Sequence, residues 1–99
     1  MEGRLSIRDV VAERRGDILR IAVEHGVSSV RVFGSAARGD EEANDLDLLI
    51  DFELGRSLLD EVAFWQDVEE LLGCQVDVVT ERGVSPYLRD RILAEARPL

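Results

Sequence analysis

Several residue types are scarce in this chain of 99 residues, and each scarcity excludes a kind of site. The single cysteine, Cys74, cannot form a disulfide within the chain, and the single histidine, His25, cannot build a histidine-based metal site or catalytic relay. Apolar runs reach only four or five residues, so no segment is long enough to span a membrane. The amino end, MEGRLSIRDVV, has no apolar core of signal-peptide length. We therefore expect a cytoplasmic protein.

Lysine is absent, and the charge balance is strongly acidic. All 12 basic residues are arginine, 21 residues are acidic, and the formal net charge is −9. Twelve of the acidic residues lie between positions 40 and 70, together with one base, Arg56. Proteins that follow a phosphate backbone usually carry a basic face, so a long nucleic acid is not expected as a partner. An acidic face instead suits a divalent cation or a basic protein surface.

The residues that are present are typical of one folded domain. The chain is 45% hydrophobic and 33% charged, which favours a globular protein over a disordered one. Its length allows one core, and no repeat, low-complexity tract or linker divides it. We expect a single domain over residues 1–99.

Helical and extended patterns alternate along the chain. We expect helices at residues 6–26, 57–73 and 85–96, strands at residues 29–33, 45–52 and 75–80, and a helical turn at SAARG. Ser6, Ser57 and Ser85 are the expected helix caps. The side chains expected on the buried helix faces are Ile7, Val10, Val11, Ile18, Ile21, Ala22, Leu58, Leu59, Val62, Trp65, Val68, Leu71, Leu72, Leu88 and Ile92.

This order, α-β-β-α-β-α, predicts an α/β (α+β) fold with a small mixed sheet flanked by helices. The tight connection after Phe33 favours antiparallel pairing of the first two strands. The long helix between the second and third strands allows those two to be parallel.

Carboxylates interrupt an otherwise apolar strand, DLDLLIDF, at residues 45–52. Successive side chains of a strand point to opposite faces, which gives one face with Asp45, Asp47, Leu49 and Asp51 and a core face with Leu46, Leu48, Ile50 and Phe52. Asp77 has a similar setting in the strand QVDVVT. Ionised carboxylates are costly to bury unless a cation or donors meet them. We therefore expect Asp45, Asp47 and Asp77 to converge on one or two hard cations such as Mg²⁺.

A glycine and a serine, Gly34 and Ser35, stand where the first strand enters a tight turn. Glycine lets a ligand approach the backbone, and the N–H groups at a turn or helix start can hold phosphate oxygens. The Ser35 hydroxyl and the Arg38 guanidinium can add contacts. A phosphate-binding turn with three carboxylates is suited to metal-assisted nucleotidyl transfer.

The segments GSAARG, DLDLLID and VDVV together resemble the polymerase-β-type nucleotidyltransferase superfamily. More closely, the short length and the ending SPYLRDRILAEARPL resemble the minimal nucleotidyltransferases, the antitoxin half of HEPN–MNT toxin–antitoxin pairs. The likeness extends from Val30 to Leu99 and implies a polymerase-β-like fold.

The resemblance also implies roles for particular residues. By this resemblance, the triphosphate is bound by Gly34, Ser35 and Arg38. The Mg²⁺ ligands are Asp45, Asp47 and Asp77. Asp77 is in addition a candidate for deprotonating the acceptor hydroxyl. The chain departs from the family in two places: nine residues separate Ser35 from Asp45, one fewer than is common, and Asn44 stands where serine is usual.

The resemblance implies an ATP-dependent enzyme that transfers AMP to a tyrosine hydroxyl of a cognate HEPN toxin, an RNase. The added phosphodiester would bring bulk and negative charge to a site that handles RNA phosphates. Two alternatives remain open: a non-catalytic antitoxin that acts by complex formation, and nucleotidyl transfer to a small-molecule hydroxyl. The missing acceptor domain argues against the latter, unless a homodimer supplies the second wall.

The same residues also have ordinary structural interpretations. Asp45 and Asp47 can form a strand-edge pair that faces water, and Gly34 with Ser35 can be a simple strand-to-helix turn. Asp51 is expected to end its strand in solvent, and the acidic residues 40–42 are expected to form a solvated loop. The structure decides which of these groups meet.

Overall fold

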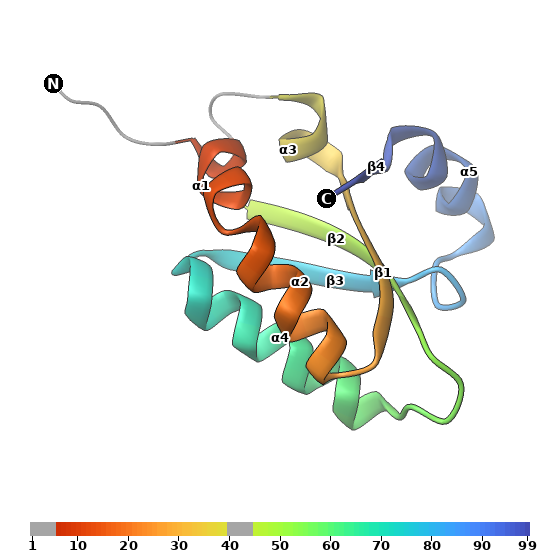
Figure 1. Ribbon diagram of the computed structural model, residues 1–99. Helices are drawn as coiled ribbons and strands as arrows, with labels where there is room; N and C mark the ends of the chain where they lie inside the picture. The colour runs from red at the N-terminus through yellow and green to blue at the C-terminus, as the bar shows by residue number, and fades with distance from the viewer. Residues whose placement is uncertain (1–5, 40–44) are drawn as a thin grey trace, which may run out of the picture.

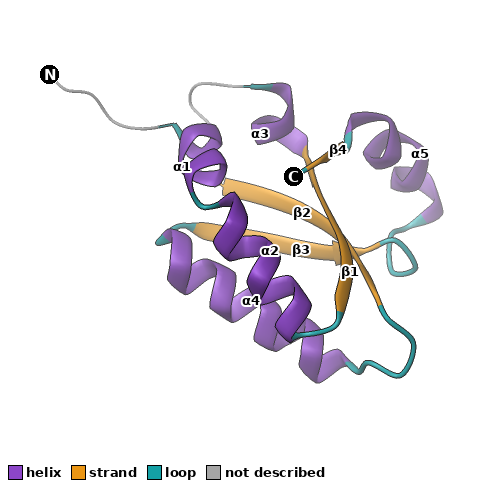
Figure 2. Ribbon diagram, viewed as in Figure 1, coloured by secondary structure: helices purple, strands orange, loops and turns teal. Residues whose placement is uncertain are grey.

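The structure, a computed structural model, describes residues 6–39 and 45–99. Its elements are α1 (Ile7–Glu13), α2 (Arg15–Glu24), β1 (Val27–Phe33), α3 (Gly34–Arg38), β2 (Asp45–Phe52), α4 (Leu58–Leu72), β3 (Gln75–Thr80), α5 (Pro86–Glu95) and β4 (Arg97–Pro98). Figure 1 shows them along the chain, and Figure 2 shows the short helix α3 directly after β1. The predicted strands at 45–52 and 75–80 have the observed bounds.

The strands form one mixed sheet in the order β3-β2-β1-β4. The β1–β2 pair is antiparallel and the β2–β3 pair is parallel, as the sequence predicts. The antiparallel strand β4 is an addition to the prediction, because its two residues include a proline and carry no strand pattern of their own.

The core lies between one face of the sheet and the helices α1, α2 and α4. Leu46, Leu48 and Ile50 of β2 are fully buried there against Phe64 and Val68 of α4. In Figure 1, α5 lies on the other side of β1 from α2 and α4. Leu49 points to that second face and is also fully buried, so the sheet is covered on both faces at this position.

The helix predicted at residues 6–26 is two helices, and the prediction is wrong in this respect. Ser6 does accept a hydrogen bond from the Asp9 amide, as expected for its cap. Arg14 then leaves the helical conformation, with φ −102° and ψ 11°, and α2 begins at Arg15. Gly16 follows the break, and glycine weakens a helix by about 0.5–1 kcal/mol relative to alanine.

Three leucines predicted to be buried are exposed. Leu58 and Leu59 in the first turn of α4 are 71% and 79% exposed, and Leu88 of α5 is 50% exposed. The first turn of α4 extends past the end of the sheet in Figure 1. Its leucines continue the apolar pattern of the helix but lie beyond the strands against which the rest of α4 packs. Ser57 is the N-cap of α4 as predicted, and its amide donates to Asp60 Oδ2 over 2.9 Å.

The edge strand β3 is bonded to α4 by side chains. The Val76 amide donates to Glu69 Oε2 over 2.9 Å, and the indole N–H of Trp65 donates to the Val76 carbonyl. Among the described helices, none combines the length and the apolar character that crossing a membrane requires.

Candidate active site

Strand pairing brings two of the predicted carboxylates together. In the parallel β2–β3 ladder Asp47 is the partner of Asp77, whereas Asp45 is the partner of Gln75. On the other side of β2, Phe33 is the partner of Asp47, so the chain turns at Gly34 directly beside that carboxylate. The site therefore lies where β1 ends and near the beginning of β2 and β3.

Gly34 is required at this turn by both conformation and space. Its φ is +74°, in the left-handed region that favours glycine. A Cβ atom at this position would overlap Oδ2 of Asp47. The turn and the carboxylate are therefore packed against each other, and any ligand of one meets the other.

The surroundings of the Asp47 carboxyl disfavour its negative charge. Burial raises its pKa above the usual value, and the negative charge of Asp77, a side-chain hydrogen bond with Asp77 and the charge of Asp45 raise it further. The Arg38 guanidinium acts in the opposite direction and lowers the pKa of Asp47. A divalent cation at this point would offset the negative charge that raises the pKa of Asp47.

The fit to a metal ion is incomplete in this arrangement of the side chains. Within residues 6–39 and 45–99, no three acidic, histidine or cysteine side chains are already gathered as a metal cluster. Asp45 and Asp77 are exposed and Asp47 is half-buried. These side chains offer oxygen ligands only, which suits Mg²⁺.

The candidate phosphate turn is the start of α3. The N-cap residue Phe33 is extended and provides no side-chain hydrogen bond to the first-turn amides. Gly34 and Ser35 are the first two residues of the helix. Their backbone N–H groups are donors of the kind that hold phosphate oxygens.

Arg38 stands in the last turn of α3 and is linked to α5. Its Nη1 atom is 3.2 Å from Oε2 of Glu95, and Arg91 Nε is 3.9 Å from the same oxygen. Sequence reasoning missed Glu95, because residues 57 positions apart give no local signal; only the i,i+4 spacing of Arg91 and Glu95 was visible. Glu95 therefore holds Arg38 on the side of the site where its charge reaches Asp47.

The remaining predicted groups lie apart from this cluster or outside the described residues. Asp51 is on the same face of β2 and accepts a hydrogen bond from the Ser29 hydroxyl over 3.4 Å. Farther along this face Arg31 pairs with Glu81, which also pairs with Arg89 of α5. The predicted acidic loop at residues 40–42, and Asn44, fall outside the described residues.

The chain is similar to known proteins in sequence. The family described as Nucleotidyltransferase domain matches residues 15–99. A Methanocaldococcus jannaschii protein named "Putative protein adenylyltransferase MJ0435" is 44% identical over 87 residues, which cover 87% of this chain and 94% of that protein. A Thermococcus cleftensis protein named "Protein adenylyltransferase MntA" is 38% identical over 71 residues, which cover 71% of this chain and 72% of that protein.

The chain is also similar to solved structures. One, described as "Structure of putative minimal nucleotidyltransferase", is 45% identical, has a TM-score of 0.84, and covers 99% of this chain and 100% of that chain. Another, "Crystal structure of the toxin-antitoxin with AMP-PNP", is 19% identical with a TM-score of 0.70 over 84% of this chain and 69% of that chain; this likeness concerns the fold alone. The predicted fold class is confirmed.

Proposed function

Because the chain belongs to the nucleotidyltransferase family, we propose that it is an antitoxin that uses Mg²⁺ and transfers AMP from ATP to a tyrosine hydroxyl of a HEPN RNase toxin. The predicted enzyme class, an adenylyltransferase, is confirmed by the family and by the names of the relatives. The use of Mg²⁺, the tyrosine acceptor and the identity of the toxin are the parts of the proposal that go beyond this enzyme class. The names of the relatives, which are protein adenylyltransferases, support the transfer of an adenylyl group to a protein.

The proposal rests on one observation: Asp47 and Asp77 are partners across the parallel β2–β3 ladder, directly beside the Gly34 turn. In this function Asp45, Asp47 and Asp77 would hold Mg²⁺, and Gly34, Ser35 and Arg38 would hold the triphosphate. When bound, Mg²⁺ would neutralise phosphate charge in the transition state. The raised pKa of Asp47 supports this role, because a site that repels its own negative charge gains most from a cation.

The reaction is a displacement at the α-phosphorus of ATP. The tyrosine oxygen forms a bond to this phosphorus, the bond to the bridging oxygen breaks, and pyrophosphate leaves. The phenolic proton passes to a carboxylate, for which exposed Asp77 is the candidate. A cytoplasmic location, where ATP and RNA are found, is part of the proposal.

The decisive experiment incubates the chain with ATP, MgCl₂ and a HEPN RNase toxin, the proposed acceptor. Intact-mass spectrometry should show the addition of one AMP to the HEPN protein, and tyrosine replacement in that protein should abolish the addition. Asp47→Asn should abolish it as well, and EDTA should do the same to the wild type. The matched control is Asp51→Asn, the same chemical change on the same strand and face, which should retain transfer.

The binding-only alternative gives a different result. If Asp47→Asn still silences the RNase activity of the toxin without adding mass, neutralisation proceeds by complex formation and the catalytic proposal is wrong. If AMP appears on an added small-molecule hydroxyl and never on the protein, the acceptor class is wrong. Both outcomes are read from the same reaction mixtures.

A further inference from the structure

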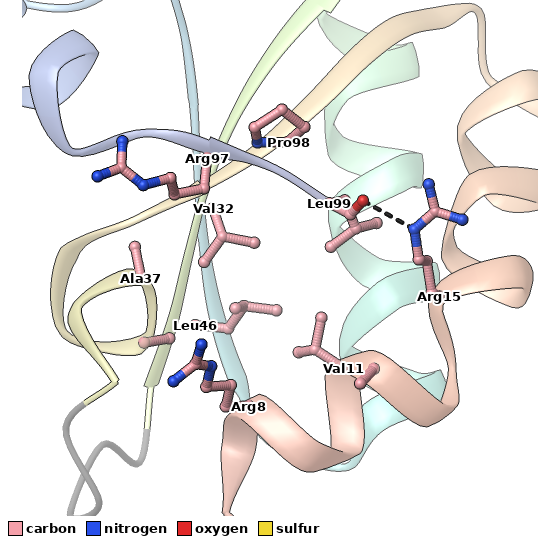
Figure 3. Close-up of a pocket in the computed structure, with 11 residues that line it drawn as sticks. Arg8, Val11, Arg15, Val32, Ala37, Leu46, Arg97, Pro98 and Leu99 are labelled. Carbon is pink, nitrogen blue, oxygen red and sulfur yellow. Dashed lines mark hydrogen bonds between the residues drawn. The ribbon is translucent and has the colours of Figure 1, made fainter.

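A cavity of about 270 Å³ lies on the face of the sheet opposite the carboxylates. Val32 of β1 and Leu46 of β2 contribute to its floor, and both alternate with the residues of the candidate active site. Val11 of α1 and Leu99 after β4 line its sides. Figure 3 shows these apolar side chains converging on the cavity from elements far apart in the sequence.

The rim of this cavity is basic. Arg8 of α1, Arg15 of α2 and Arg97 of β4 line it, and Figure 3 shows them on three different sides. Arg15 Nε donates to the Leu99 carbonyl over 2.7 Å. In the part of the chain that the structure describes, no carboxylate side chain lines the cavity and neither Arg8 nor Arg97 has an ion-pair partner.

Seven other arginines of the described residues are neutralised within the chain. Those that lie within ion-pair distance of a carboxylate are Arg14, Arg20, Arg31, Arg38, Arg56, Arg89 and Arg91. In a chain with a formal net charge of −9, three arginines that surround one apolar cavity are a local reversal of charge, since none of them lies within ion-pair distance of an acidic side chain among the described residues. This reversal favours an anionic ligand with an apolar part.

The size and the spread of charge favour a polypeptide ligand. Pockets for whole small molecules usually measure roughly 300–1,000 Å³, and this cavity is smaller, with room for one or two side chains. Guanidinium groups on three sides suit several separate carboxylates better than a single phosphate. An acidic segment with one large apolar side chain meets both conditions.

Helix α3 connects the cavity to the candidate active site. Gly34 begins the helix beside Asp47, whereas Ala36 and Ala37 of the same helix line the cavity. A helix with its side chains is about 10–12 Å wide, so a protein seated in the cavity reaches the active site around one short helix. We propose that the cavity is the docking site for an acidic segment, with an apolar side chain, of the protein that receives AMP. This inference rests on the proposed function for the identity of that protein.

The test compares charge reversals at the rim with one elsewhere. Arg8→Glu and Arg97→Glu should each weaken binding of the HEPN protein at least ten-fold in isothermal titration calorimetry. Arg82→Glu is the matched control: it is an equally exposed arginine outside the cavity, and it should change the Kd less than two-fold. The affinity for ATP should be unchanged in all three variants. Raising the salt concentration should weaken wild-type binding more steeply than binding by Arg97→Glu.

The outcomes separate docking from catalysis. Wild-type affinity of Arg8→Glu and Arg97→Glu for the HEPN protein overturns the docking site, whether or not AMP is transferred. Weak binding by these variants, together with an absence of AMP transfer by the wild-type chain itself, supports the docking site and overturns the proposed function. Failure of the wild-type chain to bind the HEPN protein overturns both. Circular dichroism melting curves verify folding, which is expected because neither arginine forms an ion pair among the described residues.

Discussion

The two faces of β2 differ in charge, although each holds a fully buried leucine, Leu48 on one face and Leu49 on the other. One face presents Leu46, Leu48 and Ile50, all fully buried against the helices. The other presents Asp45 and Asp47, which stay accessible. Burial of apolar area stabilises the strand by roughly 25 cal/mol per Å², and the same strand then holds charged groups that repel one another. The buried face of β2 therefore stabilises the strand, and the opposite face carries the carboxylates of the candidate active site.

The comparison predicts that substitutions on the buried face of β2 change the stability of the protein, whereas substitutions on the carboxylate face change its activity. Leu48→Ala should lower the free energy of unfolding by about 2–5 kcal/mol, because a fully buried leucine leaves a cavity. Urea denaturation measures the loss. The rate of AMP transfer per folded molecule should stay within two-fold of wild type. A large loss of rate with unchanged stability would contradict the division between the faces.

On the opposite face, Asp77→Asn should leave the fold intact and reduce AMP transfer at least 100-fold. Even residues that merely orient metal ligands contribute about 10–100-fold, and Asp77 is a proposed ligand. The measurement is the initial rate with the HEPN protein at saturating Mg²⁺. A variant that kept most of the rate would remove Asp77 from the site and leave the metal to β2 alone.

The turn at Gly34, which lies beside Asp47, gives a further pair of variants to compare. Gly34→Ala should destabilise the fold by about 1–2 kcal/mol, because alanine is strained at this positive φ, and should lower transfer because its Cβ would displace the Asp47 carboxylate. The matched control is Gly16→Ala, which meets no atom within 4 Å and lies in α2. It should stabilise the protein by roughly 0.5–1 kcal/mol. The Tm should therefore fall for Gly34→Ala and rise for Gly16→Ala, and only Gly34→Ala should lower the transfer rate.

The smallest effect concerns the cost of the site in the absence of metal. Asp47→Asn should stabilise the metal-free protein at neutral pH by up to about 1 kcal/mol, since like charges paired across strands are destabilising. The pKa of Asp47 is raised in the folded state above its unfolded value, so its contribution to stability declines as the pH rises through the folded pKa. The Tm of Asp47→Asn minus that of wild type should thus increase with pH.

Two comparisons check this last effect. Added Mg²⁺ should raise the wild-type Tm and leave that of Asp47→Asn nearly unchanged, because binding to the folded state alone stabilises it. Asp51→Asn should keep the rise of Tm with Mg²⁺, because Asp51 lies apart from the carboxylate cluster. A wild-type Tm that exceeds that of Asp47→Asn throughout the neutral range without metal would show that the carboxylates are not in repulsion.

Features written in local sequence could be predicted. The alternation in DLDLLIDF identifies a strand, its core face and its carboxylates, because a period of two needs no information from the rest of the chain. The proline after Ser85 and the glycine after Leu72 mark helix ends for the same reason. The expected parallel order places Asp77 beside the carboxylates of β2, but it does not give the register that pairs Asp77 with Asp47 and not with Asp45.

Features that depend on distant partners could not be predicted. The exposure of Leu58 and Leu59 arises because the sheet ends before α4 does. The ion pair between Arg38 and Glu95 joins α3 to α5, and its residues are too far apart in the chain to signal each other. The basic rim combines Arg8, Arg15 and Arg97 from three elements, and composition gives only the opposite sign of charge.

The bonds that α4 makes to Val76 have a consequence for self-association. An open sheet edge can template the strand of a second molecule, which is the first step toward fibrils. At Val76 both outward backbone groups are already occupied by Glu69 and Trp65. Glu69→Ala combined with Trp65→Phe would uncover both groups, and this edge could then pair with a strand of a second molecule.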